Sequence, residues 1–200
     1  MSRLARLRIF GLIAMLGWFA AAGAIPISFE DRADAESITN QYDGVQFVNA
    51  TALMAGLSLN ELSFPPQSGS VAVFDDGGPL ALLFSDPVSS FSAFFTYTTA
   101  LTITAFDDAS NLLATVTSAF SNNTADGGVA GSSPNELIAL NLSSSAISRL
   151  MISGFINGGS FVMDDVSFAA AAQVPVTGTL QLMLLPLLAA MMWRRRFSRH

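Results

Sequence analysis

The stretch Phe91-Ser92-Ala93-Phe94-Phe95-Thr96-Tyr97 carries an apolar or aromatic side chain at every second position, namely Phe91, Ala93, Phe95 and Tyr97. Successive side chains of a β-strand point to opposite faces, so these four share one face of an extended chain. On a helix the same four would be spread around the axis. The stretch therefore predicts a β-strand with one buried face.

The same period of two recurs from residue 25 to residue 168. Alternating runs begin at Ile25, Val45, Val71 and Leu101, and further strands are indicated around Val116, Leu137, Leu150, Ile152 and residues 162–168. Turn-forming clusters rich in Asp, Gly, Asn and Pro separate the runs at residues 75–79, 107–111 and 157–159. Short strands divided in this way predict an all-β fold, an antiparallel β-sandwich.

The N-terminus has the pattern of a secretory signal. Three arginines in the first eight residues precede an apolar run over residues 9–22, which predicts a signal helix. Ala22 and Ala24 flank Gly23 as the small residues that signal peptidase requires, so we expect cleavage after Ala24. The alternative is an uncleaved N-terminal anchor.

The C-terminus predicts a second hydrophobic helix. Residues 174–193 form an apolar segment of 20 residues, just long enough to cross a hydrocarbon core of about 30 Å. The arginines that follow, Arg194, Arg195 and Arg196, favour the cytoplasmic side for the end of the chain. One interpretation of this segment is a permanent single-span anchor.

The tail also resembles a PEP-CTERM sorting signal. Val174, Pro175, Gly178 and Thr179 precede the apolar run, and the arginine cluster at 194–196 follows it, although Val176 and Thr177 stand where that family has Glu-Pro. The resemblance implies a membrane sorting protease of the exosortase type as a partner. It implies transient anchoring in the inner membrane, removal of the tail, and release to the cell surface or extracellular space. The alternative is a sortase cell-wall signal, whose Pro-any-Thr-Gly the same residues approach.

These signals divide the chain into four parts. We expect a signal peptide at 1–24, a β-sandwich domain at 25–168, a short linker at 169–173 and the sorting segment at 174–200. Between the two terminal signals lie all 15 acidic residues and only two of the nine arginines, a net charge of −13. This charge excludes electrostatic binding of nucleic acid or anionic lipid as a main function.

The residue types of the central part also restrict its chemistry. It contains no His, Cys, Trp or Lys, which excludes a Ser-His-Asp triad, a Cys-His pair, a histidine zinc site and a Schiff-base lysine. A glycosidase with two carboxylates is the one common enzyme class that the composition permits. We therefore expect a non-enzymatic protein.

Three short motifs resemble carbohydrate-binding-module-like jelly rolls: Phe29-Glu30-Asp31, residues 40–47 and residues 161–168. The resemblance implies that the first and last strands are neighbours, which brings Glu30 close to Asp164 or Asp165. It also implies one structural calcium ion held by Glu30, Asp164 and Asp165, because a cation relieves repulsion between carboxylates and calcium prefers oxygen ligands. The alternative is that one aspartate faces solvent while the other accepts hydrogen bonds from turn amides.

The expected function follows from export and from the lack of catalytic residue types. We expect a structural or adhesive protein of surface or biofilm material, with a carbohydrate-binding module as the alternative and a two-carboxylate glycosidase as a distant third. If the chain binds extracellular polysaccharide, Tyr42 and Tyr97 are the candidate glycan contacts, although both also suit packing within strands. The polar stretch at 121–135 is either a ligand rim or a mobile tip.

Overall fold

The computed structural model describes residues 24–142 and 146–171. Within these ranges the chain forms eleven strands and no helix: β1 (Ile25–Ile27), β2 (Glu36–Ser37), β3 (Val45–Val48), β4 (Ala50–Met54), β5 (Val71–Asp76), β6 (Leu80–Tyr97), β7 (Thr102–Phe106), β8 (Leu112–Thr117), β9 (Glu136–Asn141), β10 (Ile147–Ser153) and β11 (Gly158–Ala170). Every ladder between two of these strands is antiparallel. The predicted all-β, antiparallel class is confirmed.

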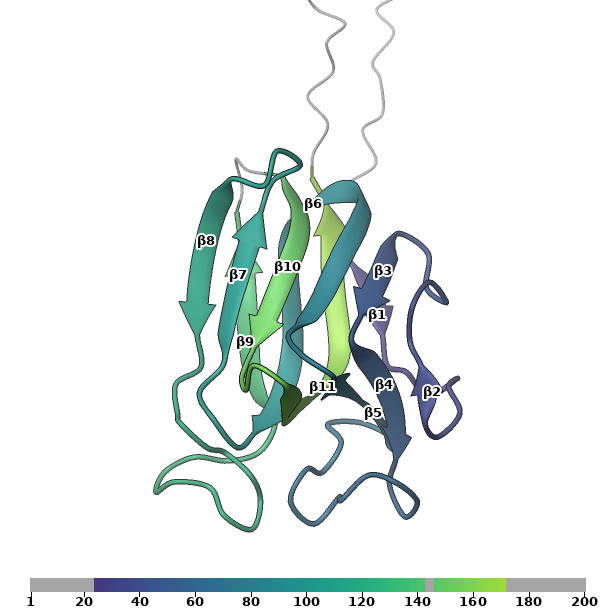
Figure 1. Ribbon diagram of the computed structural model, residues 1–200, viewed down its shortest axis with the longest axis vertical. Helices are drawn as coiled ribbons and strands as arrows, with labels where there is room; N and C mark the ends of the chain where they lie inside the picture. The colour runs from purple at the N-terminus through teal and green to yellow at the C-terminus, as the bar shows by residue number, and fades with distance from the viewer. Residues whose placement is uncertain (1–23, 143–145, 172–200) are drawn as a thin grey trace, which may run out of the picture.

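The strands form two layers, and β6 belongs to both of them (Figure 1). Its first half pairs with β3 on one side and β10 on the other, and β10 continues to β7 and β8. Its second half lies between β9 and β11, and β11 continues to β5, β4 and β2. We call the first set the front layer, since it is nearest the viewer in Figure 1, and the second set the back layer.

The passage of β6 between the layers occurs at Ser85-Asp86-Pro87. All three residues are exposed, and the pairing with β10 shifts here, from Arg149 opposite Leu83 to Ile147 opposite Val88. Pro87 has no N–H to offer a ladder, so it suits a position where pairing is interrupted. The structure therefore has one strand of 18 residues where the alternation predicted only the part from Phe91 to Tyr97.

The core lies between the layers and uses the faces that the alternation predicted. Phe91, Ala93, Phe95 and Tyr97 are all buried on the inner face of β6. On β7, Leu101 (directly before the strand), Ile103 and Ala105 are buried in the same way. Phe161 packs edge-on against Phe95, with ring centroids 5.9 Å apart, and joins β11 to β6.

Two expected boundaries differ in the structure. The motif at 40–47 is a strand only from Val45, because residues 42–44 form a turn that a single bridge from Tyr42 to Val45 closes. At the other end, β11 continues through Ala169 and Ala170, which pair with Ser90 and Val88. The domain therefore extends two residues into the segment expected to be a linker.

The predicted terminal signals fall mostly outside the described residues. Ala22 and the signal helix lie outside them, as do Val174, Pro175, Gly178, Thr179, Arg194, Arg195 and Arg196 of the tail. Ala24 is described, and the expected cleavage point after it directly precedes β1. Among the residues that the structure describes, none form a helix with the length and apolar character needed to cross a membrane.

Candidate functional site

Asp164 and Asp165 form a β-bulge in the middle of β11. The ladder with β6 shifts between Asp164 and Ser167, where β11 advances three residues while β6 advances two. Asp165 has a positive φ of 46°, and the Asp164 carboxylate accepts a hydrogen bond from the Asp165 amide at 2.7 Å. The bulge explains why two acidic residues occur in succession in a central strand.

The bulge holds a loop that approaches from the neighbouring strand. Asp164 Oδ2 accepts hydrogen bonds from the amides of Gln67 at 2.8 Å and Ser68 at 3.0 Å, and Asp165 Oδ1 accepts one from the Ser68 hydroxyl at 2.8 Å. Asp164 is 1% exposed, and burial raises its pKa to about 6 although the amides act in the opposite direction. Asp164 therefore fixes the start of the loop 67–71.

Glu30 holds the other end of the same loop. Its carboxylate accepts hydrogen bonds from the amides of Ser70 and Val71, at 3.0 and 2.8 Å. Gly69 lies against this carboxylate at a φ of +54°, and a Cβ at that position would stand 2.2 Å from the Glu30 Cδ. Because β1 pairs with β11, Glu30, Asp164 and Asp165 all reach one loop. The expected proximity of the first and last strands is confirmed.

The three carboxylates do not fit a calcium site in this arrangement. Five of their six oxygens face amide or hydroxyl donors of the loop and the bulge. No group of three or more His, Cys, Asp or Glu side chains placed to hold a metal occurs among the described residues. The contacts of Asp164 match the alternative in which an aspartate accepts turn amides.

Melting the full-length protein in calcium and in chelator tests the predicted ion. Because loop amides already satisfy these carboxylates, we expect the two melting curves to coincide. An ion present at 100 times its dissociation constant would instead stabilise the fold by about 2.7 kcal/mol, which raises Tm by several degrees. A rise of that size, lost in Asp165→Ala, would establish the calcium site.

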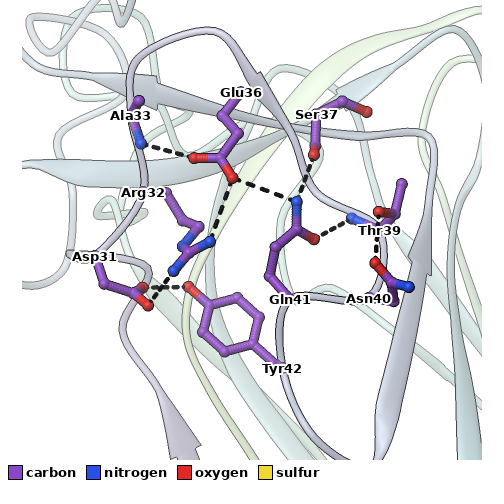
Figure 2. A network of polar contacts seen from close by, with 9 residues as sticks. All are labelled: Asp31, Arg32, Ala33, Glu36, Ser37, Thr39, Asn40, Gln41 and Tyr42. Atoms are coloured by element: carbon purple, nitrogen blue, oxygen red, sulfur yellow. Dashed lines mark hydrogen bonds and ion pairs between the residues drawn. The ribbon is translucent and has the colours of Figure 1, made fainter.

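Tyr42 lies at the edge of a polar network beside β1 and β3, in which Arg32 and Glu36 make most of the contacts (Figure 2). Its hydroxyl donates to Asp31 at 2.6 Å, and Arg32 lies over its ring, with the guanidinium carbon 5.4 Å from the ring centroid. Arg32 also pairs with Asp31 and Glu36. The Arg32 guanidinium and the Tyr42 hydroxyl lower the pKa of Asp31 to about 2. The network holds the chain between β1 and β3 in place.

The ring of Tyr42 is also part of an aromatic cluster. Phe29 and Phe47 meet it edge-on, with ring centroids 5.6 and 6.2 Å away. With Arg32 over the ring and two aromatic neighbours beside it, Tyr42 has the surroundings of a packing residue. This favours the packing interpretation of Tyr42 over that of a glycan platform.

Tyr97 is a core residue, and its prediction as a glycan contact is wrong. Its side chain has no exposed surface, because β6 turns it towards the interior between the layers. Its hydroxyl donates to Glu136 and accepts from the amide of Phe120 at 3.3 Å. Burial, together with Glu136, raises the pKa of Tyr97 to about 12. No sugar can stack on a ring that is enclosed on all sides.

The polar stretch at 121–135 packs onto the domain at several points and does not form a free tip. Asn123 is fully buried, its side chain accepting from the Tyr97 amide at 2.7 Å and donating to the Phe95 carbonyl at 2.9 Å. Asp126 accepts from the Ser63 hydroxyl at 2.7 Å, which joins the stretch to the segment between β4 and β5. The composition did indicate a polar loop. The loop is attached to the domain through Asn123, however, and its partner Tyr97 on β6 is 26 residues away in the sequence.

A groove of about 350 Å³ opens where the chain leaves β3 in the front layer and enters β4 in the back layer. Its polar lining consists of hydroxyl, amide and carboxylate side chains: Ser37, Thr39, Gln46, Asn49, Thr51 and Asp76. Asn49 occupies the corner with a positive φ of 57° and donates to the Pro79 carbonyl at 2.9 Å, while Thr51 donates to Asp76 at 3.0 Å. This groove was not predicted from the sequence, because the only polar residues of β3 and β4 are Gln46 and Thr51.

No family model matches this chain, and no curated protein does. Solved structures with some similarity include a DUF4465 family protein from Bacteroides caccae ATCC 43185, with a TM-score of 0.45 and 13% identity over 74% of this chain and 99% of that one. The K1 cleaved adhesin domain of Lys-gingipain from Porphyromonas gingivalis W83 has a TM-score of 0.43 and 10% identity, over 75% and 99%. The CBM22-1 xylan-binding domain of Paenibacillus barcinonensis Xyn10C has a TM-score of 0.40 and 11% identity, over 78% and 100%.

Proposed function

We propose that this chain is an exported, non-catalytic surface module that attaches to carbohydrate through the groove between β3 and β4. The single observation that carries the proposal is the polar lining of that groove. Sugars present many hydroxyl groups that both donate and accept hydrogen bonds, and the lining offers both kinds of partner from hydroxyl, amide and carboxylate groups. Its volume of about 350 Å³ suits a small part of a glycan chain.

The net negative charge of the domain favours a ligand that is uncharged over most of its length. The described residues carry all 15 acidic side chains of the chain and two arginines, so a densely anionic polymer is repelled at long range. A neutral polysaccharide is not, and its binding relies on short-range hydrogen bonds and packing. An adhesive or structural role in surface or matrix material is compatible with this mode of attachment.

The proposed location rests on the ends of the sequence. In this proposal signal peptidase cuts after Ala24, directly before β1, and an exosortase-like protease removes the tail that begins near Val174. The protein then passes from the inner membrane to the cell surface or the extracellular space. The intact mass of the native protein tests both cuts, because a mass that includes Met1 or Arg196 contradicts the corresponding step.

Affinity electrophoresis tests carbohydrate binding. The full-length protein is run through native gels that contain soluble xylan, glucuronoxylan, hydroxyethyl cellulose, mannan or dextran, and we expect at least one polymer to retard it. Gln46→Ala and Asp76→Ala each remove a hydrogen-bonding group from the groove, so we expect the affinity for that polymer to fall by about tenfold.

Asp108→Ala provides the matched control, because Asp108 is an exposed acid in the turn between β7 and β8. It changes the charge of the protein as Asp76→Ala does but leaves the groove intact, and we expect no change in retardation. Retardation by none of the polymers, or equal retardation of the groove variants and the control, would contradict the proposal.

A further inference from the structure

The front layer differs from the rest of the domain in charge. Its five strand segments are β3, residues 80–85 of β6, β10, β7 and β8, and they contain no Asp or Glu and a single charged residue, Arg149. All 15 acidic residues therefore lie elsewhere in the described chain. The domain therefore has a large excess of acidic residues, but the strands of its front layer contain none.

The register shows which side chains share the outer face of this layer. Arg149 lies opposite Leu83 on β6 and opposite Phe106 on β7, and Leu83 in turn lies opposite Gln46 on β3. The next row contains Val48, Ala81, Met151, Thr104 and Thr115, and the row after it contains Ser153, Thr102 and Thr117. Their neighbours in each strand point into the core. The outer face is thus a hydroxyl-bearing and apolar surface about 19 Å wide across five strands.

This face is continuous with the groove. Gln46 and Val48 line the groove and also stand at the first positions of two of the rows. A glycan seated in the groove that continues across the strands next meets Leu83 and then Arg149. Figure 1 shows the same order, with β3, β6, β10, β7 and β8 side by side.

Arg149 is held in place without an acidic partner. Its guanidinium carbon lies 4.4 Å from the centroid of the Phe106 ring, and no carboxylate of the described residues is within ion-pair distance of it. Arg32, the other arginine described, is paired with two carboxylates. The cation–π contact with Phe106 holds the guanidinium on this face, and the fork of N–H donors of an arginine suits a pair of carboxylate oxygens.

We propose that the outer face of the front layer extends the carbohydrate site and that Arg149 selects a glycan carrying a uronic acid. This inference rests on the proposed function of the groove. Its occupant is a mainly neutral polysaccharide with occasional carboxylates, one of which accepts two hydrogen bonds from the guanidinium while sugar hydroxyls meet Thr104 and Gln46. The charge of this face supports the choice, since its strand segments carry no acidic residue and one cation, Arg149.

A pair of polymers with the same backbone tests the proposal. Glucuronoxylan is compared with the same material after its carboxyl groups have been reduced to alcohols, using isothermal titration with the full-length protein. We expect the native polymer to bind about tenfold more tightly, the usual scale for a charge-assisted hydrogen-bonded pair at a partly exposed site. Arg149→Gln should remove this preference, so that the variant binds the two polymers with equal affinity, and Arg149→Lys should restore only part of it.

The outcomes separate this inference from the proposed function. If both polymers bind the native protein equally, the groove binds carbohydrate but Arg149 does not select a carboxylate, and the inference is wrong. If neither polymer binds and no other polymer does, the proposed function itself fails. Melting curves of both Arg149 variants should match that of the native protein, and Gln67→Ala, at an exposed position in the loop 67–71 outside this face, should preserve the preference for the uronate.

Discussion

Replacing Asp75 with alanine is expected to lower the free energy of unfolding by about 3 kcal/mol. Asp75 is fully buried on β5, and its carboxylate accepts hydrogen bonds from the Ser160 amide at 2.8 Å, the Ser160 hydroxyl at 2.9 Å and the Phe161 amide at 3.0 Å. These donors belong to a second irregularity of β11, where the strand advances four residues between Gly158 and Val162 while β5 advances two. The carboxylate replaces the ladder partners that this irregularity removes.

The magnitude follows from the donors that lose their acceptor. Each buried donor left without a partner costs about 1–3 kcal/mol, and part of that total is offset because the variant no longer buries a carboxylate. Burial raises the pKa of Asp75, which shows that such an offset exists. For a domain of this size the loss corresponds to a fall in Tm of roughly 6–12 °C.

Thermal and urea unfolding of Asp75→Ala, Asp75→Asn and Asp76→Ala checks this expectation. Asn keeps one acceptor oxygen and should recover part of the loss. Asp76 is the next residue on β5 and is exposed, and its carboxylate accepts a hydrogen bond only from the Thr51 hydroxyl, so removal of this side chain should cost less than about 1 kcal/mol. Equal losses for Asp75→Ala and Asp76→Ala would show that the buried carboxylate does not hold β11.

Replacing Asn123 with alanine is expected to cost about 2–3 kcal/mol and to release the stretch 121–135 from β6. The Asn123 side chain accepts from one backbone amide of β6 and donates to one backbone carbonyl, and its own amide donates to the Tyr97 carbonyl at 3.0 Å. Asn123 therefore continues the hydrogen bonding along β6 beyond Phe95, where the pairing of β6 with β9 ends. The variant leaves one N–H and one C=O buried without partners.

Limited proteolysis together with melting checks the second expectation. Cleavage within residues 125–131, an exposed part of the stretch, should become faster in Asn123→Ala than in the native protein. Asn122→Ala is the matched control, because the Asn122 side chain bonds only to the nearby Thr124. If the two variants are cut at the same rate, the attachment of the stretch does not depend on Asn123.

The strands were predictable because alternation is a local property. The faces formed by Phe91, Ala93, Phe95 and Tyr97 and by Leu101, Ile103 and Ala105 are buried as the period of two predicts. The order of the strands was not predictable, since nothing in Ser85-Asp86-Pro87 specifies that β6 continues from one layer into the other. The bend follows from which strands pair with each half of β6, and those strands lie far along the chain.

The roles of the polar residues were less predictable for the same reason. Glu30, Asp164 and Asp165 were recognised as neighbours, but their partners are amides and two hydroxyls in the loop 67–71, about 40 residues from Glu30 and about 97 from Asp164. Tyr97 appeared as a possible contact because composition leaves two tyrosines, whereas burial depends on which face of β6 the core covers. Pairwise spacing in the sequence carries no information on such contacts.

The pairing of β1 with β11 has a mechanical consequence. Ile25 lies opposite Phe168, so the start of β1 and the end of β11 lie at the same pole of the domain. β11 runs through the middle of the back layer, with β6 on one side and β5 and β1 on the other. If the module is tethered on its C-terminal side and pulled by a bound polymer, the load acts along β11. The hydrogen bonds of antiparallel neighbours lie across that direction, so they are sheared together and cannot open one after another. A domain loaded in this way resists detachment until many bonds break at once.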